Sequence, residues 1–229
     1  MTERDFLRIH IEACWGITVP PLIGTSVDLT AHTSLPPWSL YHASIAREEI
    51  TVRCPGVLPE QRATLLAQAR AAGRAFDSTT GMRREMVFQP PATTPHASHQ
   101  DTRGVVRPFT ASDLARVEAF EEGSAAYYQS HQRAPCIGVL VEGRLVCVAH
   151  SSRRITTACE LGIDTLPDAR RHGYATMATI TWTQAVRQEG LLPIYSARAD
   201  NTASVRVAAA AGYAPLVEGV YGPVSETDG

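Results

Sequence analysis

Lysine is absent from this sequence, so all 21 basic residues are arginines, set against 23 aspartates and glutamates. The formal net charge is −2 and the isoelectric point lies near 6.4. Proteins that bind nucleic acid or membrane surfaces by charge usually carry a clear excess of basic residues. We therefore expect neither nucleic acid nor a membrane as a partner.

Long apolar runs are also lacking. A transmembrane helix needs about 20 consecutive, predominantly apolar residues, and the sequence contains no such run. Residues 1–20 do not show the order of charged, apolar and small residues that defines a signal peptide. The sequence therefore predicts a cytoplasmic location.

Closely spaced cysteine pairs are missing as well. The five cysteines are odd in number and unevenly spaced: Cys14, Cys54, Cys136, Cys147 and Cys159. Both a disulfide framework and a zinc site would need paired short spacings. The pattern predicts reduced thiols, mostly in apolar segments, and no metal ion.

The remaining composition is that of a globular protein, with 44% hydrophobic and 19% charged residues, which allows a sizeable core. A segment rich in Pro, Ser, Thr and His predicts an exposed linker over residues 89–104. It separates a small α+β region, residues 1–88, from a larger domain, residues 105–225. The linker histidines His96 and His99 have no further ligand type nearby, which argues against a metal pair.

The N-terminal region contains strand-like pieces at Phe6–Cys14, Glu49–Cys54 and Met86–Phe88. A helix is predicted over Pro59–Phe76, because proline suits a first turn and leucines recur at helical spacing. Leu35–Trp38 is typical of a loop. This region carries no convincing chemical motif, and its role stays open between covering the other domain and making a dimer contact.

After the linker, the order of predicted elements is βααββ followed by βαβαβ. Thr110, with Asp113 three residues later, can form a capping box, and Glu142-Gly143 suits a two-residue hairpin turn. The predicted strands are Gly104–Pro108, Cys136–Val141, Arg144–His150, Glu160–Thr165, Leu192–Ala197 and Tyr213–Tyr221, and the helices start near Thr110, Ser124, Tyr174 and Asn201.

The segment Glu160–Met177 is the most informative part of the chain. It predicts a strand, a short turn and a helix start that contains glycine. The first N–H groups of a helix have no partner inside it, so together with the positive helix end they attract phosphate. Arg170 and Arg171 add charge just before this start, while Gly173 and Ala175 leave the backbone accessible. The segment predicts a site for a pyrophosphate-bearing cofactor.

Two motifs carry a resemblance to a known family. Thr165-Leu-Pro-Asp-Ala-Arg170-Arg-His-Gly173-Tyr-Ala175 resembles the acyl-CoA motif of the GNAT (GCN5-related) N-acetyltransferases, roughly V-x-P-x-x-R-x-x-G-x-G/A. Asn201-Thr-Ala-Ser204, followed by Gly212-Tyr213, is similar to the family's N-x-x-S helix, which ends in G-F/Y. The resemblance covers about residues 105–225. It implies an α+β fold with a central mixed, mostly antiparallel sheet flanked by helices.

The resemblance also implies acetyl-CoA as the co-substrate, with no metal. Backbone groups on the central strand would face the pantetheine and thioester, the amides from Arg171 to Thr176 would hold the pyrophosphate, and the last helix would touch the cofactor with its capping residues. The implied cofactor-binding residues are Leu161, Ile163, Asp164, Thr165, Arg170, Arg171, His172, Gly173, Tyr174, Ala175, Thr176, Asn201 and Ser204.

For catalysis, the resemblance implies Glu160 as the base that takes the amine proton; the alternative is a solvated glutamate at a strand end. Glu121 and Glu122 could attract a cationic amine or form a solvated charge pair, and His150 could relay a proton or be a satisfied histidine. Many relatives use a helix tyrosine as the general acid. Its position, seven residues after Asn201, is Ala208 here, which cannot donate a proton.

The implied function is therefore the transfer of an acetyl group from acetyl-CoA to a primary amine, by direct attack in a ternary complex. The alternative is a non-catalytic acyl-CoA-binding sensor or interaction module. The acceptor, a small molecule or a peptide, is not indicated by the sequence, and a homodimer rests on family habit alone. A nucleotide-binding protein of another fold is disfavoured, because neither G-x-x-x-x-G-K-[ST] nor G-x-G-x-x-G occurs.

Overall fold

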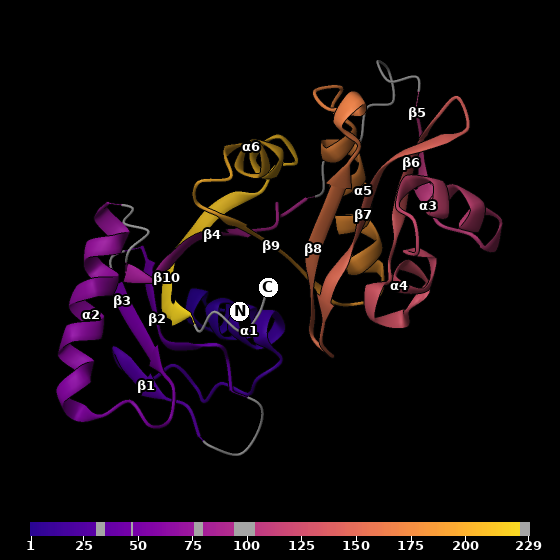
Figure 1. Cartoon of the computed structure of the whole chain (residues 1–229). Helices are drawn as coiled ribbons and strands as arrows, with labels where there is room; N and C mark the ends of the chain where they lie inside the picture. Colours follow the sequence, from indigo (N-terminus) through magenta and orange to yellow (C-terminus); the bar gives the residue numbers. More distant parts are fainter. Residues whose placement is uncertain (31–34, 47, 76–79, 94–103, 225–229) are drawn as a thin grey trace. The chain divides into compact units, whose positions relative to one another are not determined.

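The structure is a computed structural model that describes residues 1–30, 35–46, 48–75, 80–93 and 104–224. The chain divides into two compact units, each discontinuous in sequence (Figure 1). The first unit comprises Met1–Gln89, Ser196–Val205 and Pro215–Gly229, and the second comprises Pro90–Tyr195 and Arg206–Ala214. We expected one continuous domain over residues 105–225, whereas residues 196–205 and 215–224 group with the first unit. His96 and His99 lie outside the described residues.

A five-stranded arrangement forms the first unit, in the order β1-β3-β2-β10-β4. β1 runs parallel to β3, and β2 runs antiparallel to both β3 and β10. The C-terminal strand β10 belongs to this unit because it pairs with β2 from Val217 to Val224. The elements are α1 (Glu3–Trp15), β1 (Ser26–Asp28), β2 (Trp38–Ile45), β3 (Glu48–Arg53), α2 (Pro59–Arg74), β4 (Arg83–Gln89) and, from Pro215 on, β10 (Ala214–Val224).

The N-terminal segment corrects a sequence prediction. We expected a strand over Phe6–Cys14, but these residues lie in helix α1. Thr2 caps the helix: its hydroxyl accepts from the Asp5 N–H at 3.1 Å, and the Asp5 carboxylate accepts from the Thr2 N–H at 3.0 Å. The buried residues recur at helical spacing, and this burial together with the cap outweighs the local apolar–polar alternation. They are Phe6, Leu7, His10, Ile11, Ala13 and Cys14.

Helices α1 and α2 cover opposite faces of the sheet in the first unit. Neighbouring residues of a strand point to opposite faces. In β2, Tyr41 contacts the aromatic residues of α1, whereas Leu40 packs with Ala69 and Ala72 of α2. β2 itself begins at Trp38, inside the stretch that we expected to be a loop. Six of its eight residues are buried, so it lacks the alternation by which a strand is found in a sequence.

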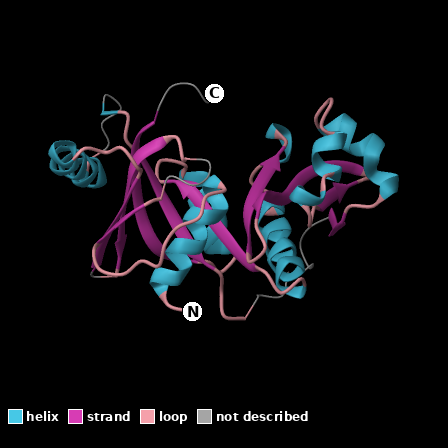
Figure 2. Ribbon diagram, turned by 90° about the horizontal axis from the view of Figure 1, so that it is seen from below, coloured by secondary structure: helices cyan, strands magenta, loops and turns pink. Residues whose placement is uncertain are grey.

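The second unit has the strand order β9-β8-β7-β6-β5, antiparallel throughout except that β8 and β9 are parallel. Figure 2 shows its helices lying against these strands. This mixed, mostly antiparallel sheet with flanking helices confirms the predicted fold class. The elements are β5 (Gly104–Pro108), α3 (Leu114–Phe120), α4 (Ala125–Gln129), β6 (Ile137–Val141), β7 (Arg144–Arg154), β8 (Ala158–Thr165), α5 (Tyr174–Gln188), β9 (Leu192–Arg198) and α6 (Thr202–Ala210), and the last two also enter the first unit.

Local signals of the second unit are realised as predicted. Asp113 closes the capping box at Thr110, because the Thr110 N–H donates to the Asp113 carboxylate at 2.8 Å. The two oxygens of the same carboxylate also accept hydrogen bonds from Arg107, at 2.6 and 2.7 Å. These bonds hold the pKa of Asp113 well below its usual range. Glu142 and Gly143, with φ of 51° and 81°, form the tight turn between β6 and β7.

All five cysteines are free thiols, and four of them are buried. Burial raises the pKa of the Cys136 and Cys147 thiols to about 12 and that of the Cys54 thiol to about 11. At neutral pH these groups are protonated and therefore poor nucleophiles. Among the described helices, none combines the length and the apolar character needed to cross a bilayer.

Candidate active site

The strand–turn–helix predicted over Glu160–Met177 is present in the second unit. β8 leads through a 3-10 turn, Pro167–Ala169, into α5. Gly173 is the N-cap of α5 with φ +79°, and Arg171 also has a positive φ of +67°. Such left-handed positions, alternating with ordinary ones, turn successive N–H groups toward one side and form an anion-binding concavity.

No side chain caps the start of α5. The first helical bond is donated by the Met177 N–H to the Gly173 carbonyl, at 3.1 Å. The amides of Tyr174, Ala175 and Thr176 therefore precede the intrahelical bonding pattern, and they remain available for an anion. An added Cβ at Gly173 would have no heavy atom within 4 Å, so glycine is required here for its backbone angle and not for space.

Side chains around this turn add positive charge. Arg170 and Arg171 are both exposed, and Arg170 Nε donates to the Thr165 carbonyl at 3.4 Å, which holds its side chain beside the end of β8. The His172 ring stacks on the Tyr174 ring, with centroids 5.5 Å apart. The predicted residues 170–176 thus form one exposed, cationic turn with accessible backbone.

β8 and β9 pair over a short stretch and then part. Their parallel register runs from Ala158 opposite Leu192 to Glu160 opposite Ile194, while β8 continues to Thr165. Beyond Glu160 the edge of β8 is therefore outside this ladder, and its backbone groups can serve a ligand. The predicted residues Leu161, Ile163 and Thr165 lie on this edge segment.

Glu160 lies at the point where the two strands part. It is only 7% exposed, and its carboxylate accepts a 3.5 Å hydrogen bond from the Ser152 hydroxyl and lies 3.9 Å from Arg153 Nη1. Ser152 is an extra residue on β7, because Ser151 faces Leu161 while Arg153 faces Glu160. This β-bulge directs Ser152 toward Glu160, as bulges near active sites commonly do.

His150 occupies an aromatic cluster beside β8. Its Nε2 lies 3.1 Å from the Tyr127 hydroxyl, and its ring contacts the Tyr127 and Tyr128 rings edge to face. A Cβ at Gly162 would lie 2.5 Å from two atoms of the imidazole, so glycine there makes room for the ring. Burial, helped by the nearby Arg133 charge, lowers the pKa of His150 to about 4. The ring is therefore neutral at physiological pH.

Two carboxylates flank the Tyr128 hydroxyl in the same region. The hydroxyl donates to Glu121 Oε2 at 3.3 Å, and the Asp164 carboxylate lies close enough to act on both groups electrostatically. Asp164 is exposed on β8, but its neighbours desolvate it in part, and this desolvation, with repulsion from Glu121, raises its pKa. A cation placed here would relieve that repulsion. Asp164, predicted as a cofactor residue, thus lies in an acidic, aromatic cluster.

The helix residues of the second motif fall in the first unit. Asn201 Oδ1 accepts from the Ser204 N–H at 3.1 Å, so Asn201 caps α6 as predicted. Ala208, in the second unit, is fully buried and offers no proton donor. Tyr213 is a core residue whose hydroxyl lies 2.7 Å from that of Thr183.

Three residues near the site were not predicted from the sequence: Tyr127, Tyr128 and the bulge residue Ser152. The two tyrosines reach the site because α4 packs over β7, a contact between distant segments. A signal was present: a tyrosine pair shortly after the paired acids Glu121 and Glu122 lies on the stretch already suspected of lining the acceptor site.

A family comparison agrees with this geometry. Residues 110–218 match the model of the GNAT acetyltransferases. The matched segment, just under half of the chain, is similar to the GNAT acetyltransferases. A comparison with curated proteins finds no match.

The fold of this chain has a counterpart among solved structures. The GCN5-related N-acetyltransferase of Sphaerobacter thermophilus superposes with a TM-score of 0.52 at 13% identity, covering 83% of this chain and 82% of that chain. A GNAT-family protein of Novosphingobium aromaticivorans gives a TM-score of 0.48 at 16% identity, and the match covers 61% of this chain and 63% of that chain. A GNAT-family acetyltransferase of Colwellia psychrerythraea gives a TM-score of 0.49 at 17% identity, and the match covers 61% of this chain and 55% of that chain. The chain thus spans less than two thirds of the latter two proteins.

Proposed function

We propose that the protein is an N-acetyltransferase that moves the acetyl group of acetyl-CoA to a primary amine by direct attack. The observation that carries this proposal is the start of α5, where Arg171 and Gly173 take positive φ values next to uncapped amides. It directly follows a strand whose edge leaves its ladder at Glu160. A cationic backbone cradle and a free strand edge in this order suit an elongated ligand with a pyrophosphate and an amide-containing arm.

The residues of this segment fit acetyl-CoA, which supplies the acetyl group as a reactive thioester. The amides of Tyr174–Thr176 would accept the pyrophosphate oxygens, with Arg170 and Arg171 adding charge. Backbone groups of β8 between Leu161 and Thr165 would pair with the amides of the pantetheine arm. A β8 N–H near Leu161 would stabilise the negative charge that develops on the carbonyl oxygen.

Glu160 is suited to accept the proton of the attacking amine. The C–N bond forms, the C–S bond breaks, and the proton lost by nitrogen passes to the Glu160 carboxylate, directly or through one water. The departing thiolate would take its proton from water, because Ala208 stands at the helix position where many relatives have tyrosine. Ser152 and Arg153 hold the Glu160 carboxylate in place.

The acidic cluster beside His150 supports a positively charged acceptor. Glu121 and Asp164 lie near the Tyr128 hydroxyl, and an ammonium group bound there would offset their mutual repulsion. The Arg133 guanidinium already lies over the Tyr127 ring, 4.1 Å from its centroid, and Tyr128 is buried, so the two carboxylates and not the rings would attract the cation. We infer that the acceptor approaches β8 from this cluster.

A thiol-release assay against a panel of amines tests the proposal. Glu160→Gln should lower kcat by roughly 10²–10⁴, the usual contribution of a general base, while the Kd for CoA stays unchanged. Glu60→Gln, an exposed glutamate of α2, serves as the matched control and should keep full activity. Absence of both CoA binding and thiol release would refute the proposal. Tight CoA binding without turnover of any amine would favour the sensor alternative.

A further inference from the structure

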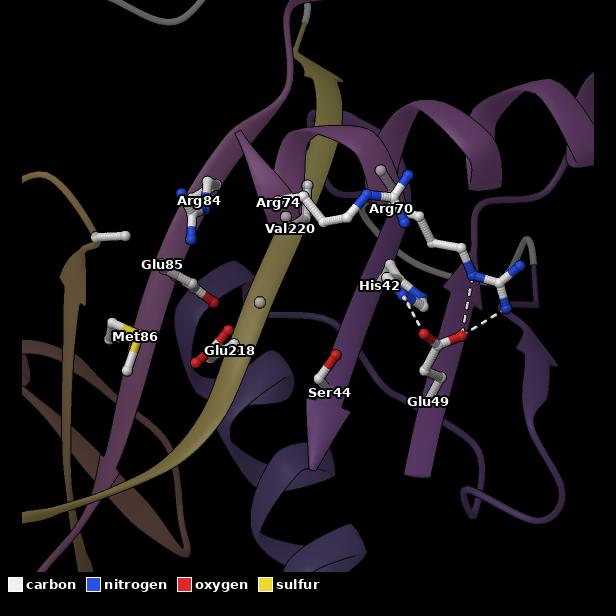
Figure 3. Close-up of a pocket in the computed structure, with 14 residues that line it drawn as sticks. His42, Ser44, Glu49, Arg70, Arg74, Arg84, Glu85, Met86, Glu218 and Val220 are labelled. Atoms are coloured by element: carbon white, nitrogen blue, oxygen red, sulfur yellow. Dashed lines mark hydrogen bonds and ion pairs between the residues drawn. The ribbon is translucent and has the colours of Figure 1, made fainter. Parts of the chain in front are cut away.

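A separate pocket lies in the first unit, between α2 and one face of the sheet (Figure 3). Its volume is about 210 Å³, which is below the roughly 300–1,000 Å³ of sites for drug-sized ligands. Its walls come from α2, β2, β3, β4 and β10, all within this unit. Nothing in the proposed acetyl transfer uses these residues.

Small residues on α2 create this space. Ala69 and Gly73 face the sheet, and a Cβ at Gly73 would lie 3.7 Å from Val220 Cγ2, an ordinary contact distance. The helix therefore approaches β10 without a side chain that fills the gap. Val220 and Ala69 are buried and give the pocket an apolar floor.

Charged groups surround this floor, and one pair is already satisfied. Arg70 donates two hydrogen bonds to Glu49 Oε2, at 2.9 and 2.5 Å, which Figure 3 shows as dashed lines. His42, between them, forms a 3.2 Å hydrogen bond with Thr51, and burial lowers its pKa, so it is neutral. This end of the pocket is electrostatically balanced.

Three further charged side chains lack such a partner. Arg74, Arg84 and Glu218 all line the pocket, and within the described part of the chain none of them forms a side-chain hydrogen bond or ion pair. Arg74 and Glu218 are exposed and Arg84 is half-buried, and the Arg74 charge acts on Glu49 only at longer range. Figure 3 shows Arg74 on α2 and Arg84 on β4, on either side of β10, which carries Glu218.

One more acid, Glu85, borders the pocket but is occupied elsewhere. Its Oε1 accepts from the Tyr41 hydroxyl at 2.6 Å and lies 2.8 Å from His10 Nε2, on the α1 side of the sheet. The groups facing the pocket are therefore three arginines, at 70, 74 and 84, and two glutamates, at 49 and 218. The arginines exceed the glutamates by one positive charge.

We propose that this pocket binds a free acidic amino acid. Arg74 and Arg84 each offer a guanidinium for one carboxylate, since arginine matches carboxylate geometry, and Glu218 accepts the ammonium group. A ligand with two carboxylates and one ammonium carries a net charge of −1 and neutralises the excess positive charge. The pocket volume suits a molecule of this size, and the apolar floor suits its methylene carbons.

Calorimetric titration of the full-length protein without acetyl-CoA tests the ligand class. The probes are L-glutamate and L-aspartate, with L-glutamine lacking one carboxylate and glutarate lacking the ammonium group. We expect one acidic amino acid to bind, and the two analogues of glutamate to bind at least about tenfold more weakly, as expected when a charged hydrogen-bonding group loses its partner. No binding of either acidic amino acid, or equal affinity for an analogue, overturns the proposal.

Variants assign the binding to this pocket. Arg84→Gln should weaken binding at least about tenfold, whereas Arg83→Gln, its exposed neighbour on the other face of β4, should not. Gly73→Leu should abolish binding by filling the space, without lowering Tm, because leucine favours a helix more than glycine does. Gly73→Ala should keep most of the affinity. Binding that survives both Arg84→Gln and Gly73→Leu places the ligand elsewhere and overturns the proposal.

Discussion

Acidification should destabilise the second unit through His150. The imidazole is 4% exposed, its Nδ1 has no hydrogen-bond partner among the residues that the structure describes, and burial lowers its pKa to about 4. An unfolded histidine has a pKa of about 6.5. Between these two values the unfolded chain binds a proton that the folded protein does not. The folded state therefore loses stability as the pH falls from about 6.5 toward 4.

The magnitude follows from the two pKa values. The difference between the unfolded and folded pKa values of His150 corresponds to a loss of at most roughly 3 kcal/mol in the free energy of unfolding, because one pH unit is worth about 1.4 kcal/mol. Most of this loss occurs above pH 4. Between pH 7.5 and pH 5 the linkage relation gives a loss of about 2 kcal/mol from this one group.

Urea denaturation followed by circular dichroism at pH 7.5 and pH 5 measures this effect. The wild type should lose about 2 kcal/mol more than His150→Gln, which cannot titrate but keeps a polar group near Tyr127. His131→Gln, an exposed histidine of the same unit, is the matched control and should behave as the wild type. Equal pH dependence in the wild type and His150→Gln would refute the reasoning, as would an NMR titration of His150 with a midpoint near 6.5.

Three further predictions concern the same unit. Asp113→Asn should lower the free energy of unfolding, measured by urea denaturation, by about 3 kcal/mol, because it breaks the ion pair of a buried carboxylate with Arg107. The pKa of Asp113 is lowered in the folded state, so this contribution is present above about pH 4 and is lost in acid. A variant whose stability falls as steeply in acid as that of the wild type would contradict this prediction. Gly173→Ala and Gly190→Ala should each cost about 1 kcal/mol at a positive φ, but only Gly173→Ala should weaken CoA binding by calorimetry, and equal affinities would remove the proposed cradle. Tyr213→Phe should lower stability by about 1 kcal/mol through loss of its bond to Thr183, with CoA affinity unchanged; a large loss of affinity would assign the hydroxyl a role at the site.

Elements with strong local signals were predictable from the sequence. Gly104–Pro108 and Tyr174–Gln188 have the predicted bounds, because a proline, a capping turn and a glycine mark their ends. Phe6–Cys14 failed because its residues alternate locally, while burial against the sheet selects the helix. β2 could not be found, since a strand buried on both faces has no period of two.

The candidate site likewise contains residues that a sequence motif identifies and residues that only tertiary packing brings in. Arg170–Thr176 and Glu160 are one continuous segment, so a motif identifies them. Tyr127 and Tyr128 join them only through the packing of α4 on β7, which no short pattern encodes. The pocket of the first unit is harder still, because it depends on β10 lying beside β4.

The position of β10 has a consequence for biosynthesis. In the first unit this strand stands between β2 and β4, yet it follows both of them in the sequence, separated from β4 by the whole of the second unit's sheet. Until it emerges, β2 keeps an open edge, which invites pairing with other chains. The amino-terminal part therefore cannot complete its fold first, as nascent domains commonly do. A nascent chain of this protein has to protect that half-built sheet until β10 has been made, and chaperone dependence in the cell is the expected cost.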